Sequence, residues 1–410
     1  MKTILQVATF LISLSATASA QVAPAATGPS SLPVNGNLQY ALRYAQTAQF
    51  SSFEPNLVAS TLSGSLNYTN TSQRLPFTID YGGGYTWTVT GPTYESGLFQ
   101  RMMISQGIDW RKWKVLVSDN VSYLPQAPTL GFSGIPGTGE PIGVTNPVPS
   151  SSQTILTLNT HVVDNAATGK IEHVLSYATS ISADGGSEML RFPNHDGLDT
   201  DTLSINGQVV QRLTARNGLI GRYAFSNYSY PGSTSSIKTN TGLVGFRRIW
   251  TRNLTTEAGA GPEWIASTIN TVVPTTTNFA ANATMAYKHR FSTMNLRYGH
   301  GTNGGSGYLI GGLVDTVQGD FSHDFGANWS VGMSSGYERT TGLNSKGVTN
   351  AVFGGAQATW RAGRNLIVFA NYTGTNQSST VALPTNALNQ LLQVIGFGFG
   401  YSPRVAHLRQ

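Results

Sequence analysis

The feature that most constrains this chain is a two-residue alternation of apolar with small or polar side chains, repeated in long segments. Leu38, Tyr40 and Leu42 show it near the start, and the segment from Trp329 to Tyr337 shows it near the end. This period indicates a β-strand with one apolar and one polar face. The segments are roughly ten to fifteen residues long. A tilted strand needs about nine to eleven residues to cross the hydrocarbon layer of a membrane, so the segments are long enough to span it.

Turn-forming residues separate these segments in two ways. Predicted short turns lie at 72–74, 111–112, 215–217, 251–253, 288–290, 325–327 and 362–364. Longer connections are predicted at 125–150, 183–200, 303–312 and 377–387. Short turns at one rim and long loops at the other are typical of an up-and-down membrane barrel. The wide gap after residue 112 is predicted to hold an extra strand pair, at about 153–164 and 170–183.

The sequence therefore predicts an all-β fold, a transmembrane antiparallel up-and-down β-barrel of about eighteen strands, with sixteen as the alternative if 153–183 lies outside the wall. The aromatic residues support a membrane barrel over a soluble sandwich, because they gather at both ends of the strands. Those next to the short turns are Trp113, Trp250, Tyr287, Trp329, Trp360 and Tyr401, and those nearer the long loops are Tyr44, Trp87, Tyr177, Tyr298, Tyr337 and Tyr372.

Composition excludes several other classes. Only 11% of the residues are charged, about half of what a soluble domain carries. The chain has no cysteine, which excludes disulfides and thiolate metal sites. Its basic residues are not gathered in one stretch, so nucleic-acid binding is not expected.

The termini indicate export. Residues 1–20 combine a positive start, a short apolar core and a small-x-small cleavage site, which predicts a signal peptide. Residues 21–36 form a flexible periplasmic lead-in, 37–403 the barrel, and 404–410 a short basic tail. The expected location is the bacterial outer membrane, with its lipid and the barrel assembly machinery as partners. Homo-oligomerisation is left open.

Charged residues on the polar faces of the segments are the predicted pore-lining set: Arg43, Asp80, Lys114, Glu172, Arg212, Arg222, Lys288, Arg297, Asp320 and Glu338. The 125–150 loop is the longest and is apolar, so we expect it either to fold inward and narrow the pore, or to pack over the rim or against a neighbouring subunit. Its constriction candidates are Leu130, Phe132, Ile135, Glu140 and Ile142.

Motifs for chemistry are weak. The seven histidines have no metal-binding spacing, and no nucleophile elbow occurs, so no enzymatic activity, metal or cofactor is expected. Asp196, Asp199 and Asp201 cluster in one loop, where a solvated turn competes with a weak cation site.

Several stretches carry a resemblance. QVIGFGFGYSPR at 393–404, GVTNAVFGGAQATWR at 347–361, LPQAPTLGFSGIPGTGE at 124–140 and DGLDTD at 196–201 resemble uncharacterised, porin-like outer-membrane β-barrel proteins of soil-dwelling Gram-negative bacteria. The resemblance implies the fold and the membrane, but no substrate or catalytic residue. One departure is that nine residues follow Tyr401, whereas such barrels usually end on an aromatic residue that the assembly machinery reads.

Two functions follow from these expectations. The first is a passive or weakly selective channel for small hydrophilic solutes, with a mild anion preference from the surplus of Arg and Lys. The second is a barrel in a larger envelope system, such as exopolysaccharide export, or an adhesive or scaffold barrel. A soluble secreted all-β protein is a third, weaker alternative.

Overall fold

The computed structural model describes most of the chain beyond its N-terminal segment. The described residues are 37–52, 56–70, 72, 74–91, 97–124, 161–193, 198–268, 273, 275–304, 310–343, 347–380, 390–403 and 406–407. In this part of the chain there is no helix, and so none long and apolar enough to cross a membrane. The predicted signal peptide, the lead-in and the 125–150 loop lie outside the described residues.

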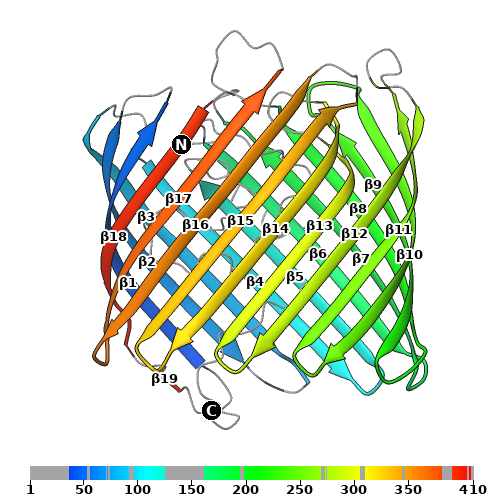
Figure 1. The fold of residues 1–410 in the computed structure, drawn as a ribbon, viewed down its shortest axis with the longest axis horizontal. Helices are drawn as coiled ribbons and strands as arrows, with labels where there is room; N and C mark the ends of the chain where they lie inside the picture. The colour runs from blue at the N-terminus through cyan, green and yellow to red at the C-terminus, as the bar shows by residue number, and fades with distance from the viewer. Residues whose placement is uncertain are drawn as a thin grey trace, which may run out of the picture.

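The described residues form eighteen long strands and one short strand, and Figure 1 shows how they are arranged. They are β1 (Asn37–Ser51), β2 (Leu57–Asn70), β3 (Phe77–Thr90), β4 (Gly97–Trp110), β5 (Trp113–Leu124), β6 (Val162–Val174), β7 (Thr179–Arg191), β8 (Thr200–Arg212), β9 (Asn217–Ser229), β10 (Ser236–Thr251), β11 (Leu254–Ser267), β12 (Thr276–His289), β13 (Ser292–Asn303), β14 (Gly312–Phe325), β15 (Trp329–Gly342), β16 (Val348–Ala362), β17 (Leu366–Ser379), β18 (Gln390–Tyr401) and β19 (Ala406–His407).

The strands form one closed antiparallel sheet. Each of the first seventeen pairs with the next strand in sequence, and β18 pairs with β1 from Leu42 opposite Tyr401 to Ser51 opposite Leu392. Because the long strands all have two neighbours, the sheet has no free edge, which is what a β structure in lipid requires. The prediction of an eighteen-stranded up-and-down barrel is confirmed.

Close contact between strands helps the ends of the sheet to join. At Gly398 on β18, an added Cβ atom would lie 2.5 Å from the Tyr44 carbonyl oxygen and 2.5 Å from the ring of Phe369. Glycine therefore leaves room inside the wall for Phe369, which is only 1% exposed. A larger residue at 398 would push the first and last strands apart.

The rims have the predicted asymmetry (Figure 1). Turns of two to six residues join β2 to β3, β4 to β5 and the later pairs at one rim, whereas all the long connections lie at the other. Every predicted short turn falls at or beside one of these joints. Short turns face the periplasm and long loops face outward in outer-membrane barrels.

The extra strand pair was placed wrongly by about ten residues. The structure has it at β6 and β7, joined by a turn at 175–178, and not at 153–164 and 170–183. The stretch from Asn165 to Gly169 looks like a turn in sequence but lies within β6, where small side chains cover the wall. The real turn contains Leu175 and Tyr177, two residue types usually found in strands, and Tyr177 is 91% exposed. Tyr177 therefore lies at the short-turn rim, and not near the long loops.

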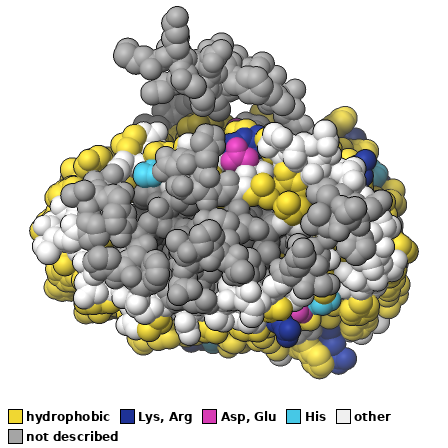
Figure 2. All heavy atoms as spheres, turned by 90° about the horizontal axis from the view of Figure 1, so that it is seen from above, with side chains coloured by type: hydrophobic (Ala, Val, Ile, Leu, Met, Phe, Trp, Pro, Cys, Tyr) yellow, Lys and Arg dark blue, Asp and Glu magenta, His cyan; other side chains and the backbone are white. Residues whose placement is uncertain are grey.

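The two faces of the sheet differ in character. The outer face carries large apolar side chains such as Leu42, Ile205, Val244 and Phe397. The protein leaves these side chains 54–68% exposed, so that in a membrane only lipid would cover them. Seen down the barrel in Figure 2, hydrophobic side chains accordingly dominate the perimeter. An exposed apolar band of this extent fits a lipid environment and no aqueous one.

Outward-facing aromatic residues mark both limits of that band. Trp113, Trp250, Trp329 and Trp360 lie at the short-turn ends of their strands, and each is at least 40% exposed. Trp329 and Trp360 are direct cross-strand partners, with ring centroids 5.8 Å apart. Trp87, Trp264, Tyr298 and Tyr337 lie toward the long-loop ends. Such belts occupy the two membrane–water interfaces.

Candidate functional site

The inner face of the barrel is the candidate site, because it is the polar side of a closed wall. Strand register places all ten predicted pore-lining residues on this face. Lys114 is opposite Glu172, Arg222 is opposite Gln208, and Arg297 is opposite Gln318. Their location on the inner face is thus a property of the fold, whereas their part in conduction is a proposal taken up below.

A charge network on β8 to β11 is the best-ordered part of this face. Arg222 donates from Nη2 and Nε to Oε1 of Gln208, at 2.8 and 3.1 Å, and reaches Oε1 of Glu257 at 3.3 Å. Arg247 donates from Nη2 and Nε to the other oxygen of Glu257, at 2.7 and 2.9 Å. Glu257 is therefore shared by two guanidinium groups, which leaves the cluster with one net positive charge.

Other polar groups are also tied together across strands. Asn67 donates to Asp80 at 3.0 Å, and Arg101 lies 4.0 Å from the other oxygen of the same carboxylate. Asn206 donates to Asp184 at 2.8 Å. These bonds hold side chains against the wall, so the inner face presents fixed hydrogen-bonding groups to whatever occupies the interior.

Several inner-face residues were not among those predicted from the sequence. Glu257 and Arg247 are cross-strand partners, but only the register reveals this, and sequence alone does not give the register. Asp164, Asp184 and Glu188 belong to the misplaced strand pair, so the alternation was counted from the wrong start. Had the turn been predicted at 175–178, the two-residue alternation counted from it would have placed these three residues on the polar face.

The inner face carries no surplus of basic residues in the described strands. Its basic side chains are Arg43, Arg101, Lys114, Lys170, Arg212, Arg222, Arg247, Lys288, Arg297 and Arg361, and its acidic ones are Asp80, Asp109, Asp164, Glu172, Asp184, Glu188, Glu257, Glu263, Asp320, Asp324 and Glu338. The expected lumen-side excess of Arg and Lys is therefore wrong for the part of the wall that the structure describes.

The acids are distributed unevenly along the axis. Asp164, Glu188, Glu263 and Glu338 lie within five residues of the long-loop ends of β6, β7, β11 and β15, whereas Arg101 is the basic residue at that level in the described strands. In the described strands, the wall near the outer mouth therefore carries more acidic than basic residues. This layering could not be read from total charge.

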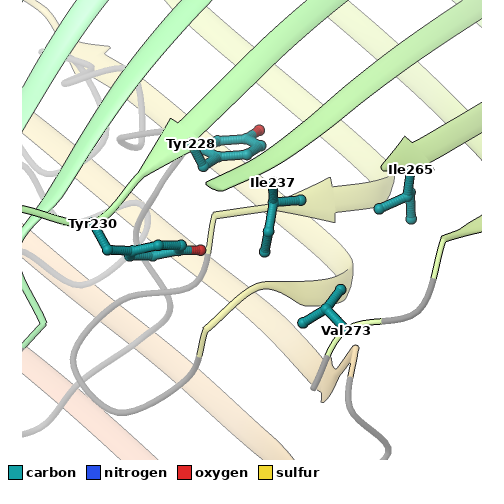
Figure 3. Close-up of a cluster of buried hydrophobic side chains, with 5 residues drawn as sticks. All are labelled: Tyr228, Tyr230, Ile237, Ile265 and Val273. Atoms are coloured by element: carbon teal, nitrogen blue, oxygen red, sulfur yellow. The ribbon is translucent and has the colours of Figure 1, made fainter. Parts of the chain in front are cut away.

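A cluster of buried apolar side chains lies at the outer mouth (Figure 3). Tyr228, Tyr230, Ile237, Ile265 and Val273 are at most 3% exposed, although they come from the ends of β9, β10 and β11 and from the connections beside them. Leu198, Ile310 and Leu343, from three further long-loop connections, pack against them. Described parts of several loops therefore converge on one side of the mouth and bury a common core.

Hydrogen bonds fix the cluster. The Tyr230 hydroxyl donates to the Gly304 carbonyl, and the Tyr228 hydroxyl donates to the Thr302 carbonyl at 3.4 Å. Burial raises the pKa of Tyr230 well above its ordinary value, so its hydroxyl stays protonated as a donor. At Gly304 an added Cβ would lie 2.5 Å from the Tyr228 ring, so the loop backbone packs directly on the aromatic face.

Glu263 lies on the inner face beneath this cluster. It is 3% exposed and accepts bonds from Thr302 Oγ1 at 2.7 Å, from Thr302 N at 3.1 Å and from Thr241 Oγ1 at 3.2 Å. All of these donors are neutral, so the carboxylate is hydrogen-bonded without an opposite charge from them. It links the end of β13 to β10 and β11.

The two loop sites predicted from sequence have different outcomes. The five constriction candidates lie outside the described residues, and so does Asp196. Asp199 and Asp201 are described: Arg191 Nη2 lies 2.6 Å from Asp201 Oδ1, and Asp199 Oδ1 accepts a bond from the Phe192 N–H at 2.9 Å. In the described residues no group of three or more potential metal ligands comes together.

Comparisons with known proteins give similarity of fold only. No family model and no curated protein matches the sequence. Solved structures that match include Pseudomonas aeruginosa OccK9 (OpdG), with a TM-score of 0.46 at 8% identity over 90% of this chain and 98% of that one. OccK2 (OpdF) of the same species, in complex with glucuronate, has a TM-score of 0.44 at 9% identity over the same shares. Acinetobacter baumannii OccAB3 has 0.42 at 8% identity, over 90% of this chain and 99% of that one.

At these scores the similarity carries no argument about solutes. The architecture itself is decisive for location: a closed antiparallel wall, an apolar outer face and a polar inner face form an outer-membrane β-barrel.

Proposed function

We propose that this barrel is a weakly selective channel for small hydrophilic solutes, and not an enzyme. The observation that carries the proposal is the inner face of the eighteen-stranded wall. Its ionised and amide side chains bond to one another along the wall, as in the Arg222–Glu257–Arg247 network, and do not pack as an apolar core. A wall of this strand number is wide enough to enclose water. The ten pore-lining residues named from sequence would then face that water.

The charge pattern supports weak selectivity. Opposite charges in similar numbers line the wall, so the interior field is small except at the acidic outer mouth. We therefore replace the expected anion preference with near-neutral selectivity, because a pore selects ions by the unbalanced charge that lines it.

Reconstitution tests the channel. The refolded mature chain, shown to be folded by heat-modifiable migration on gels, should give stepwise currents in planar bilayers and a reversal potential near zero in a KCl gradient. Vesicles containing it should swell in neutral sugars of small size. A folded barrel that conducts no ions and admits no sugar would refute the proposal.

The 125–150 loop is a separate proposal, which rests on its length and apolar composition. If its constriction candidates enter the lumen, deletion of residues 128–148 should raise single-channel conductance. Unchanged conductance in a folded deletion variant would assign the loop to the rim instead.

Two partners complete the proposal. We propose that the barrel assembly machinery inserts the chain and reads the β18 strand, whose last residue, Tyr401, faces outward and is 49% exposed. Homo-oligomerisation is supported by a polar pair on the lipid-facing wall, where Asn165 donates to Asp119 at 2.9 Å. A second copy would cover this pair. The mass of the detergent-solubilised protein tests the oligomer.

A further inference from the structure

The short-turn rim is strongly basic. Seven basic side chains lie in six of the eight short turns, and none of the eight turns contains Asp or Glu. The basic residues, called here the turn arginines and Lys112, are Arg74, Arg111, Lys112, Arg216, Arg252, Arg290 and Arg364. All seven are exposed. The positive charge that was expected in the lumen is therefore concentrated at this rim.

Two of these arginines occupy positions where the backbone conformation favours glycine. Arg111 has φ 47° and Arg290 has φ 43°, and they are the non-glycine residues with positive φ in the described chain. Other short turns place glycine in that region, as at Gly326 (φ 67°) and Gly363 (φ 93°). A side chain in the left-handed region is strained, whereas glycine is not. Turn stability therefore does not explain the choice of arginine.

The turn arginines and Lys112, together called the basic ring, lie at the level of lipid headgroups. Trp110 and Trp113 flank Arg111 and Lys112 directly, and both are outward-facing aromatics at 66% and 41% exposure. On the outer wall beside the 252–253 turn, the guanidinium of Arg248 lies 4.0 Å from the centroid of the Trp250 ring. Such aromatics mark the membrane interface, so residues one or two positions beyond them meet the headgroup phosphates.

Six of the seven residues are arginine. The guanidinium group is planar, stays charged at any physiological pH and bonds to two phosphate oxygens at once. Seven exposed cations without a neighbouring turn carboxylate also attract net negative charge at a membrane surface. Chemistry and position thus point to the same ligand.

We propose that the turn arginines and Lys112 bind the phosphate groups of anionic phospholipids in the leaflet at the short-turn rim. The ring thereby enriches those lipids around the barrel and fixes the depth of its short-turn end. The proposal is independent of conduction, since it concerns side chains in the turns and not the inner wall.

Quenching of tryptophan fluorescence tests it. The mature chain with Trp87→Phe and Trp264→Phe keeps tryptophans only near the short-turn rim. In mixed vesicles of phosphatidylglycerol and phosphatidylcholine, either lipid is brominated in turn, and the quenching gives their relative binding constant at those tryptophans. We expect phosphatidylglycerol to be favoured about fivefold, the factor for one basic residue at an anionic surface, or more. High salt should reduce this preference toward one.

Two sets of variants separate the ring from general charge. Replacing all seven residues with glutamine should abolish the preference. Arg111→Gly and Arg290→Gly together remove two charges while relieving backbone strain, so this barrel should fold at least as well and show a reduced preference. The matched control, Arg191→Gln with Lys238→Gln and Arg339→Gln, removes outer-wall charges at the opposite rim and should leave the preference unchanged.

A relative binding constant of one in the parent chain would overturn the proposal. So would an unchanged preference in the folded glycine and glutamine variants. Single-channel conductance, measured on the same samples, shows whether the channel function holds separately.

Discussion

Neutralising Glu257 is the sharpest test of the proposed channel. Glu257 contacts Arg247 at 2.7 Å and Arg222 at 3.3 Å, so Glu257→Gln removes the one carboxylate that these two guanidinium groups share. The cluster then changes from one net positive charge to two. Glutamine has the same shape and still accepts a hydrogen bond, so the change is chiefly electrostatic.

The size of the effect follows from the exposure of the network. Arg247 is 42% exposed and Glu257 is 19% exposed, so water screens the cluster and the effective dielectric is close to that of water. One added charge acting on an ion about 5 Å away gives about 0.8 kcal/mol, which screening at about 0.1 M salt reduces to about 0.5 kcal/mol. Anions become about twofold more concentrated near the cluster and cations about twofold less, so their permeability ratio should rise about fourfold.

Reversal potentials in a KCl gradient measure this ratio. Glu257→Gln should shift the reversal potential toward chloride, and Arg247→Gln should shift it toward potassium. The matched control is Asp119→Asn, which removes a carboxylate from the lipid-facing wall and should not change the ratio. If folded Glu257→Gln barrels show the parent reversal potential, the network does not border the ion path, and the assignment of the inner face to conduction fails there.

Two other predictions concern the outer mouth and the lipid-facing wall. Ile265→Ala should cost about 2–5 kcal/mol of packing free energy in the apolar cluster. Combined with Tyr230→Phe, it should release the loops and give a higher and noisier single-channel current. A quiet current like that of the parent would show that the cluster does not restrict the mouth. Asp119→Leu should stabilise the isolated barrel by about 1–3 kcal/mol in bilayer unfolding experiments, since Asp119 lies between Trp113 and Tyr123 at mid-membrane depth. The control is Val121→Leu on the same face. A destabilised Asp119→Leu barrel would contradict the lipid-facing assignment.

Much of the fold could be predicted because membrane strands obey local rules. Each strand crosses the bilayer on its own, so its length, its alternation and its aromatic ends are all visible in one segment, as from Trp329 to Tyr337. The short turns are equally local. The exception, the pair β6 and β7, shows the limit of this rule. Ala167 and Gly169 on β6, and Gly185 on β7, leave the middle of these two strands without large outward side chains, so the alternation is weak there.

The candidate site was predicted less completely because it depends on register. Alternation placed Arg222 on the polar face but gave no partner for it. Its contact with Glu257 bridges a strand, since Arg222 is on β9 and Glu257 on β11. The apolar cluster was missed for a related reason. Ile237 and Ile265 have the pattern of ordinary strand residues, and only the folding of loops over the mouth brings Tyr230 and Leu343 to them.

The position of a charge decides what it can do in this barrel. On the wall, acidic and basic side chains are present in similar numbers and some lie close together, as Arg247 and Glu257 do at 2.7 Å, so their fields largely offset each other over distances beyond about one Debye length. A solute there experiences hydrogen-bonding groups at close range and little net attraction. At the rims the charges are less balanced, with acids such as Glu188 and Glu338 at the outer mouth and arginines in the turns at the other end. If the barrel conducts as proposed, long-range attraction acts where solutes and lipids first meet the protein, while short-range contacts govern passage along the wall. The proposed channel would therefore discriminate weakly among solutes that have already entered.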